Sequence, residues 1–272
     1  MKQLILLKVI VQIKSKKSLG QNFLIDKNIL NIISNSVEIK NDDKILEIGP
    51  GTGNLTEFLI KKKPKKIFLI EKDKSLLEIL KNKFNKDVEI FNEDFLDFSN
   101  PKLLKNELII FGNLPYNISS QILVKLIINK EKFHIKKMIF MFQKELADRI
   151  ISNENSKNYG RLSVLAKWKF NINKIIDINP NSFLPKPKVK STLLLFSPKE
   201  KFLKLKKPEN LEYVTRVFFN QRRKKIKKPL NILFQNKTEI VNKLNLDINL
   251  RPQNIPFKTF FEITKEYEKL IG

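Results

Sequence analysis

The sequence predicts an α/β fold, in which an open sheet carries helices on both faces and a small helical domain follows it. Five short apolar runs between residues 44 and 142 have the length and composition of buried strands, and helical segments separate them. A glycine-rich turn joins the first run to the next helix, as in sheets that bind nucleotide-type ligands. The predicted strands are Lys44–Leu46, Ile67–Ile70, Val88–Phe91, Leu108–Phe111 and Met138–Phe142.

The chain divides into three predicted parts. Residues 1–40 form an N-terminal arm and helix, residues 41–197 form the sheet domain, and residues 198–272 form a small, basic helical domain. The 272 residues, 42% of them hydrophobic, suffice for one domain of ordinary size and a smaller one. Further predicted elements are a helix at Gln143–Ile150, a strand pair at Trp168–Ile178 and Val189–Phe196, and helices at Leu211–Asn220, Ile226–Phe234 and Phe260–Leu270.

The glycine-rich turn spans Glu47–Gly53 and has the spacing G-x-G-x-G. Glycines let a ligand approach the backbone closely. The third glycine comes one residue earlier than in the dinucleotide fingerprint, where the helix N-terminus seats a pyrophosphate. S-adenosylmethionine has no pyrophosphate, so the spacing favours it, although such a turn alone is equally compatible with a structural loop.

Polar residues follow four successive predicted strands, namely Gly49, Glu71, Asp94 and Asn113. The carboxyl ends of such strands meet at one edge of the sheet, where open α/β sheets bind ligands. Glu71 is placed to accept hydrogen bonds from two ribose hydroxyls, and Asp94 from an adenine amine with Phe95 against the ring. Each acid taken alone is also compatible with a solvated loop charge.

The segment Asn113-Leu114-Pro115-Tyr116 follows the fourth strand. The side-chain oxygen of Asn113 and the carbonyl of Leu114 can accept the two N–H groups of an exocyclic amine on a flat heterocycle. Pro115 stiffens the turn, and Tyr116 offers the base a stacking face. The alternative is a tight turn after a strand with a half-buried tyrosine.

A net charge of +25 indicates a polyanionic partner, although an AT-rich coding sequence would also raise the lysine content. Local clustering is more informative. On a helix, Arg222, Arg223, Lys224 and Lys225, with Lys227 and Lys228 after them, would form a phosphate-binding face; the alternative is a solvated surface.

The absence of cysteine excludes disulfides, cysteine-based zinc sites and cysteine nucleophiles, and no metal is expected. The apolar stretch at residues 4–13 is too short to span a membrane.

Four motifs together resemble those of the ribosomal RNA adenine dimethyltransferases, and most closely the small-subunit branch of that family. They are Lys16–Leu24, Glu47–Gly53, Asn113–Tyr116 and Ser182–Ser191, and the resemblance extends from about residue 16 to the C-terminus. It implies a Rossmann-like, S-adenosylmethionine-dependent methyltransferase sheet with a small helical domain. It also implies that S-adenosylmethionine contacts Asn22, Leu24, Gly49, Glu71, Asp94 and Asn113.

The resemblance further implies that Asn113, Leu114 and Tyr116 hold a target adenine and that Phe183 closes over it opposite Tyr116. On the residues alone, Phe183 is equally well explained as a core anchor within a proline-rich loop. The implied reaction is dimethylation of the N6 amines of two adjacent adenosines near the 3′ end of small-subunit (16S) rRNA. The implied partner is that rRNA within a pre-ribosomal 30S particle. The protein itself is expected to be a monomer in the cytoplasm.

Three other functions remain open at this point. A large-subunit rRNA adenine methyltransferase of the macrolide-resistance type shares the same pocket, and a non-catalytic nucleic-acid-binding factor could retain the fold. The glycine spacing disfavours an NAD-dependent oxidoreductase.

Two features depart from the family pattern. Lys225 and Lys228 stand where a Thr and an Asn are usual, and Pro229 follows them near a helix start. The apolar lead at residues 1–13 is either an extension or a presequence.

Overall fold

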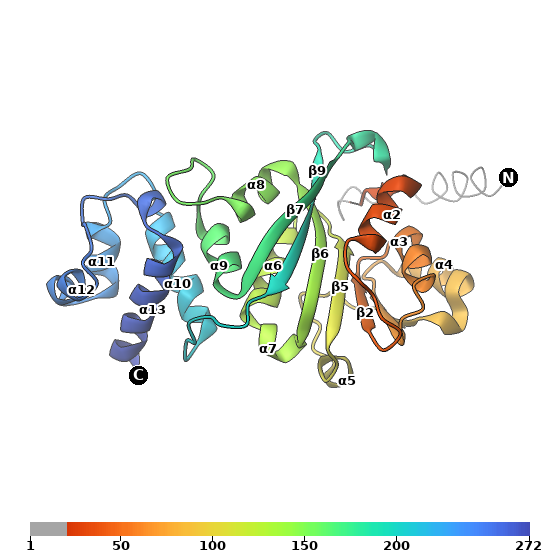
Figure 1. The fold of residues 1–272 in the computed structure, drawn as a ribbon, viewed down its shortest axis with the longest axis horizontal. Coiled ribbons are helices and arrows are strands. Elements are labelled where there is room, and N and C mark those ends of the chain that lie inside the picture. Colours follow the sequence, from red (N-terminus) through yellow and green to blue (C-terminus); the bar gives the residue numbers. More distant parts are fainter. Residues whose placement is uncertain (1–20) are drawn as a thin grey trace. The chain divides into compact units, whose positions relative to one another are not determined.

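The computed structural model describes residues 21–272, so the first part of the predicted arm lies outside the described residues. Its centre is a seven-stranded sheet with the order β4-β3-β2-β5-β6-β9-β7 (Figure 1). Strands β2 to β6 run parallel, and β9 pairs antiparallel with β6. All five strands predicted between residues 44 and 142 are confirmed. The strands are β2 (Lys44–Ile48), β3 (Lys66–Ile70), β4 (Glu89–Phe91), β5 (Leu108–Asn113), β6 (Ile135–Gln143), β7 (Phe170–Ile178) and β9 (Ser191–Pro198).

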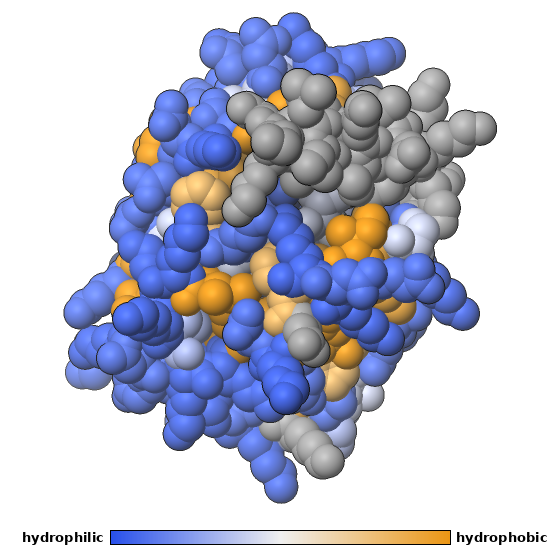
Figure 2. Space-filling model, turned by 90° about the vertical axis from the view of Figure 1, so that its right-hand side faces the viewer, coloured by the Kyte–Doolittle hydropathy of each residue, from blue (hydrophilic) through white to orange (hydrophobic). Residues whose placement is uncertain are grey.

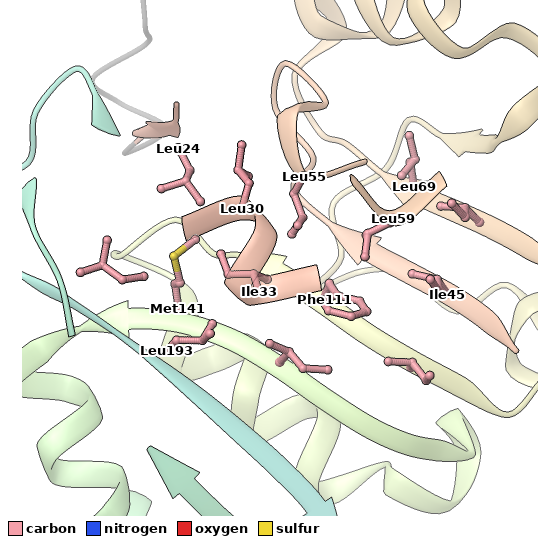
Figure 3. Close-up of a cluster of buried hydrophobic side chains, with 14 of the residues drawn as sticks. Leu24, Leu30, Ile33, Ile45, Leu55, Leu59, Leu69, Phe111, Met141 and Leu193 are labelled. Carbon is pink, nitrogen blue, oxygen red and sulfur yellow. The ribbon is translucent and has the colours of Figure 1, made fainter. Parts of the chain in front are cut away.

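The central strands are apolar along their whole length because both faces of the sheet are covered. On β5, Ile109 and Phe111 face a cluster formed by helix residues such as Leu30, Ile33 and Leu59 (Figure 3). Alternate residues of a strand point to opposite faces, and Ile110 is as buried as its neighbours, so the opposite face is covered as well. This confirms the predicted α/β sheet with helices on both faces. The surrounding helices are α2 (Lys27–Asn35), α3 (Asn54–Ile60), α4 (Lys74–Phe84), α5 (Pro101–Leu104), α6 (Ser119–Ile128), α7 (Lys130–Phe133) and α8 (Lys144–Ile151).

A second sheet has only two strands, β1 (Phe23–Leu24) and β8 (Phe183–Leu184). They pair antiparallel, with Phe23 opposite Leu184 and Leu24 opposite Phe183. Helix α2 starts directly after β1, where the side chain of Asp26 accepts hydrogen bonds from the backbone N–H groups of Asn28 and Ile29. The N-terminal segment is therefore tied to a loop that lies far away in the sequence.

The contacts divide the described chain into two compact units. The first comprises residues 21–123, 131–147 and 173–196, and the second comprises residues 124–130, 148–172 and 197–272. In the second unit, α9 packs against α10 and α13, and the hydroxyl of Tyr159 donates to the carbonyl of Ile255 at 3.0 Å. The predicted boundaries at residues 40 and 197 stay a prediction about independent domains. The helices of the second unit are α9 (Arg161–Lys169), α10 (Pro208–Phe219), α11 (Lys227–Leu233), α12 (Lys237–Lys243) and α13 (Phe257–Ile271).

One expectation about this unit is wrong. Trp168 belongs to the end of α9 and not to the following strand. The basic block from Arg222 to Lys225 lies in the turn between α10 and α11, which is also the gap between the two predicted helices. Pro229 explains the break, because a proline is accommodated in the first turn of a helix and not in its interior, so a new helix must begin just before it.

Within the described residues, no helix combines the length and the apolar character that crossing a bilayer requires. The face of the molecule in Figure 2 is mostly hydrophilic, with hydrophobic side chains visible between the polar ones.

Candidate active site

A cavity of about 230 Å³ lies at the carboxyl ends of β2, β3 and β5. All of the residues that the sequence predicts for the cofactor line it, and so do three of the four predicted for the target base. The fourth, Phe183, does not line it. The lining residues among those predicted are Asn22, Leu24, Gly49, Glu71, Asp94, Asn113, Leu114 and Tyr116.

The glycine-rich turn adopts a backbone that only glycine accommodates readily. Gly49, Gly51 and Gly53 have φ angles of 67°, 61° and 76°. A Cβ at Gly53 would lie 2.3 Å from a ring carbon of Phe84, so α4 packs directly on the turn. The turn is thus shaped by backbone conformation and by a close neighbour, and its path along the cavity is fixed before any ligand binds.

Glu71 is held in place by the backbone around it. One carboxylate oxygen accepts the N–H of Gly51 at 3.1 Å and the other accepts the N–H of Asp73 at 2.8 Å. Its burial raises the pKa of the carboxyl group, and the two backbone bonds oppose this rise. Each oxygen keeps a further lone pair, so the carboxylate can still accept ligand hydroxyls.

Asp94 lies at the other end of the cavity and forms an ion pair with Lys72 at 2.7 Å. Its second oxygen accepts the backbone N–H of Leu96 at 2.9 Å. Acceptance of a hydrogen bond from an adenine amine by Asp94 stays a prediction. Phe95 lines the cavity beside it.

Glu47 is a buried acid of the cavity that the sequence analysis did not single out as a site residue. It accepts the hydroxyl of Thr56 at 2.7 Å. Burial, and secondarily the negative charge of Glu71, raise the pKa of Glu47 to about 7. Glu47 could have been predicted as a site residue from its place just before the glycine turn, because the carboxyl ends of strands at this edge of the sheet face the ligand.

The segment Gln21–Leu24, which we call the strap, runs along the cavity and is held by side-chain amides. Asn54 donates to the carbonyl of Leu24 at 2.8 Å, and Asn113 donates to the carbonyl of Asn22 at 2.7 Å. Gln21 donates to Asp73 at 3.0 Å. Together with the pairing of β1 and β8, these bonds explain how residues so early in the chain come to line the cavity.

The bond to the strap also fixes the orientation of the Asn113 amide. Because Nδ2 donates to the Asn22 carbonyl, Oδ1 is the atom left to accept a hydrogen bond from a ligand. This is the orientation that the predicted recognition of an exocyclic amine requires. The strap was predicted to contact the cofactor through Asn22 and Leu24, and it also contacts Asn113, the residue predicted to bind the base.

Tyr116 is half-buried, and its hydroxyl forms a 2.7 Å hydrogen bond with the hydroxyl of Ser191. Burial raises the pKa of the Tyr116 phenol, and the bond to Ser191 opposes this rise. A phenol whose pKa is raised stays neutral at ordinary pH and is a poor base, and stacking of the ring on a base stays a prediction.

Phe183 lies in the hydrophobic core and is 2% exposed. It packs in the same cluster as Leu24, Leu30 and Met141, all three of which are labelled in Figure 3. This position agrees with the alternative given for Phe183 from the sequence, in which the ring anchors its loop in the hydrophobic core. Contact between Phe183 and a target base stays a prediction.

In the basic block, Arg222 and Lys225 make hydrogen bonds within the protein, and three of the four side chains are exposed. The guanidinium of Arg222 donates to the carbonyl of Lys157 and, at 3.3 Å, to Gln253. Lys225 donates to Asn249 at 2.8 Å but is exposed, as are Arg223 and Lys224. RNA binding by this block stays a prediction, and Arg223 and Lys224 are the members best placed for it. In the part of the chain that the structure describes, no group of three or more carboxylate or histidine side chains is arranged to hold a metal ion.

Known proteins are similar to this chain along almost its whole length. The model of the ribosomal RNA adenine dimethylase family matches residues 12–269. The ribosomal RNA small subunit methyltransferase A of Pelagibacter ubique is 53% identical over 261 residues, which cover 96% of this chain and 99% of that protein. A solved dimethyladenosine transferase from Plasmodium falciparum matches with a TM-score of 0.79 and 28% identity, covering 91% of this chain and 98% of that one. The 23S rRNA methyltransferase ErmE shares the fold, with a TM-score of 0.65 and 23% identity over 90% of this chain and all of that one.

Proposed function

Because the chain belongs to the ribosomal RNA adenine dimethylase family, we propose that it dimethylates the N6 amines of adenosines in small-subunit (16S) rRNA, with S-adenosylmethionine as the donor. The observation that supports this most directly is the orientation of Asn113. Its Nδ2 is occupied by the strap, and its Oδ1 is left for an amine at the rim of the same cavity. The targets we propose are the two adjacent adenosines near the 3′ end of that rRNA, within a 30S precursor particle. We propose that the protein acts there as a monomer in the cytoplasm.

The cavity fits the donor by its chemistry. Glu71 offers oriented carboxylate oxygens for two ribose hydroxyls, and Asp94 with Phe95 offers an acceptor and a ring for an adenine. The glycine turn lets the remaining part of the molecule approach the backbone. When bound, the donor supplies a methyl group that its sulfonium already activates. The protein therefore needs to position the methyl group and the amine and does not need to activate the donor.

Base recognition requires two acceptors and a flat face. Asn113 Oδ1 and the Leu114 carbonyl accept the two N–H groups of the adenine amine, and Tyr116 stacks on the base. Two acceptors favour a more pyramidal nitrogen, whose lone pair is then less delocalised into the ring. They also stabilise the positive charge that develops on nitrogen during transfer.

The transfer needs no strong base among these residues. The nitrogen lone pair forms the new N–C bond, the electron pair of the C–S bond returns to sulfur, and the amine proton leaves to water after charge has developed. Alignment of the nitrogen with the methyl group therefore supplies most of the acceleration. The neutral phenol of Tyr116 is consistent with this role division.

The test is to incubate the purified protein with labelled S-adenosylmethionine and unmethylated small subunits, and to map modified nucleosides by mass spectrometry. We expect N6,N6-dimethyladenosine at two adjacent positions near the 3′ end of the rRNA. Large subunits from the same cells serve as the matched control. Label in the large-subunit rRNA would favour the macrolide-resistance alternative, and donor binding without transfer to either subunit would favour a non-catalytic factor.

A further inference from the structure

The hydroxyl of Tyr116 is anchored by a buried serine from a distant part of the chain. Ser191 lies 75 residues after Tyr116, is fully buried, and bonds the phenol at 2.7 Å. Stacking alone uses the ring face and has no need of a bond at the hydroxyl. The bond therefore has a different consequence, which is to fix the ring against rotation and in-plane displacement.

Ser191 itself is held rigidly. It is the first residue of β9 and pairs with Gln143 of β6. On one side of it, the N–H of Lys144 donates to the carbonyl of Lys190 at 2.9 Å. On the other side, the hydroxyl of Thr192 donates to Asp177 at 2.7 Å. Strand pairing, a main-chain bond at Lys190 and a side-chain bond at Thr192 together hold Ser191 in a fixed place in the sheet.

Tyr116 is also fixed at its backbone. The hydroxyl of Ser119 donates to the carbonyl of Tyr116 at 3.2 Å, and Ser119 is buried. Pro115, just before it, limits the backbone further. With the main chain held on one side and the phenol on the other, the ring plane has one defined orientation at the cavity.

We propose that Ser191 is a positioning residue that acts through Tyr116, and that it contributes more to the second methyl transfer than to the first. This inference rests on the proposed dimethylation of adenine. It goes beyond that proposal because it assigns a residue outside the cavity and a distinct step to it.

The reason for the difference lies in the amine. An unmethylated amine has two N–H groups for Asn113 Oδ1 and the Leu114 carbonyl. After the first transfer, one hydrogen has been replaced by methyl, and only one acceptor can still be used. The nitrogen lone pair must again form an N–C bond as the C–S pair returns to sulfur and the last amine proton leaves to water. Because only one hydrogen bond then holds the edge of the base, the stacking plane supplies a larger share of the alignment, and loosening the ring slows this step more.

The experiment compares Ser191→Ala, Tyr116→Phe and the double variant with the unaltered protein on unmethylated small subunits. Each variant is sampled at the same total number of methyl groups transferred, and mass spectrometry gives the ratio of dimethyladenosine to monomethyladenosine. We expect each single variant to lower the ratio about three- to tenfold, the effect of one neutral hydrogen bond. The double variant should match the singles, because all three lack the same bond.

Two matched controls remove hydroxyls elsewhere. Ser163→Ala deletes a fully buried serine hydroxyl in the second unit, and Tyr213→Phe deletes a phenol hydroxyl on α10. Neither should change the product ratio. Donor affinity, measured by calorimetry, should stay within about twofold in all variants, because Ser191 does not line the cavity and the lost bond orients the residue assigned to the base and not one assigned to the donor.

An unchanged product ratio in both Ser191→Ala and Tyr116→Phe would overturn the inference while leaving dimethylation by the unaltered protein intact. Multiplying losses in the double variant would do the same, since they would show two independent effects. If Ser191→Ala does not fold, Tyr116→Phe tests the same bond from its other end. The absence of any methyladenosine with the unaltered protein would instead refute the proposed function.

Discussion

Replacing Glu47 with glutamine tests whether the buried acid of the cavity titrates near neutral pH. Burial raises the pKa of Glu47 from its ordinary 4.5 to about 7. Each tenfold change in proton affinity is worth about 1.4 kcal/mol, so the rise corresponds to about 3 kcal/mol of unfolding free energy. A glutamine at this position has no charge, and its side-chain oxygen can still accept the hydroxyl of Thr56.

The direction follows from linkage. A carboxyl whose pKa is higher in the folded state stabilises the fold fully below its unfolded pKa, and this stability is lost as the pH rises through the folded pKa. The loss therefore falls between about pH 4.5 and about pH 7. The Glu47→Gln variant lacks this loss, so its advantage over the unaltered protein should grow by about 2 kcal/mol between pH 5.5 and pH 8.5.

The assay is urea unfolding without donor, followed by circular dichroism at both pH values. Urea is uncharged and leaves ionic interactions unscreened, and the linear extrapolation gives the free energy of unfolding. The control is Glu78→Gln, which removes an exposed carboxylate from α4. If the advantage of Glu47→Gln over the unaltered protein is the same at both pH values, Glu47 does not titrate in this range and the argument from burial fails.

Three further predictions concern donor, base and RNA. Asn113→Ala should abolish methyl transfer and leave RNA affinity nearly unchanged in a filter-binding assay; a large loss of RNA affinity would contradict its role. Gly53→Ala should weaken donor binding by at least tenfold in calorimetry, because the added methyl would meet the ring of Phe84 at a residue with positive φ, and unaltered affinity would show that the turn adapts. Neutralising Arg223 and Lys224 together should reduce the slope of log affinity for RNA against log salt concentration by about two. An unchanged slope would show that neither side chain contacts RNA phosphates and that both belong to an ordinary solvated surface.

The parallel strands could be predicted because their chemistry is local. A run such as Leu108–Phe111 is too apolar for any place but a sheet covered on both faces, and the structure buries it completely. The cavity residues Gly49, Glu71, Asp94 and Asn113 could be predicted for the same reason, since each follows such a strand. The topology then brings them to one edge.

The contacts that refine the site could not be predicted because they join distant segments. Nothing near Asn22 in the sequence indicates that its carbonyl will meet the amide of Asn113. Likewise, no local pattern links Tyr116 to Ser191. The cluster that buries Phe183 is assembled from several strands and helices, so its burial follows from the fold and not from its own loop.

The helical unit shows the limits of local patterns in another way. The short helix α12 was not predicted, because seven largely exposed residues leave only Ile240 buried and give little apolar periodicity. The basic block lies in the gap between two predicted helices, and Pro229 stands near the start of the second of them, as expected for a proline.

The pairing of β1 with β8 has a consequence for how the protein is made. A growing chain emerges from its N-terminus, so β1 leaves the ribosome long before its partner strand has been synthesised. Until Phe183 and Leu184 appear, the strap has only side-chain amides to hold it, and the donor cavity lacks a finished wall. The paired form of the strap, and with it this wall of the cavity, is therefore completed only after the chain has been synthesised beyond Leu184.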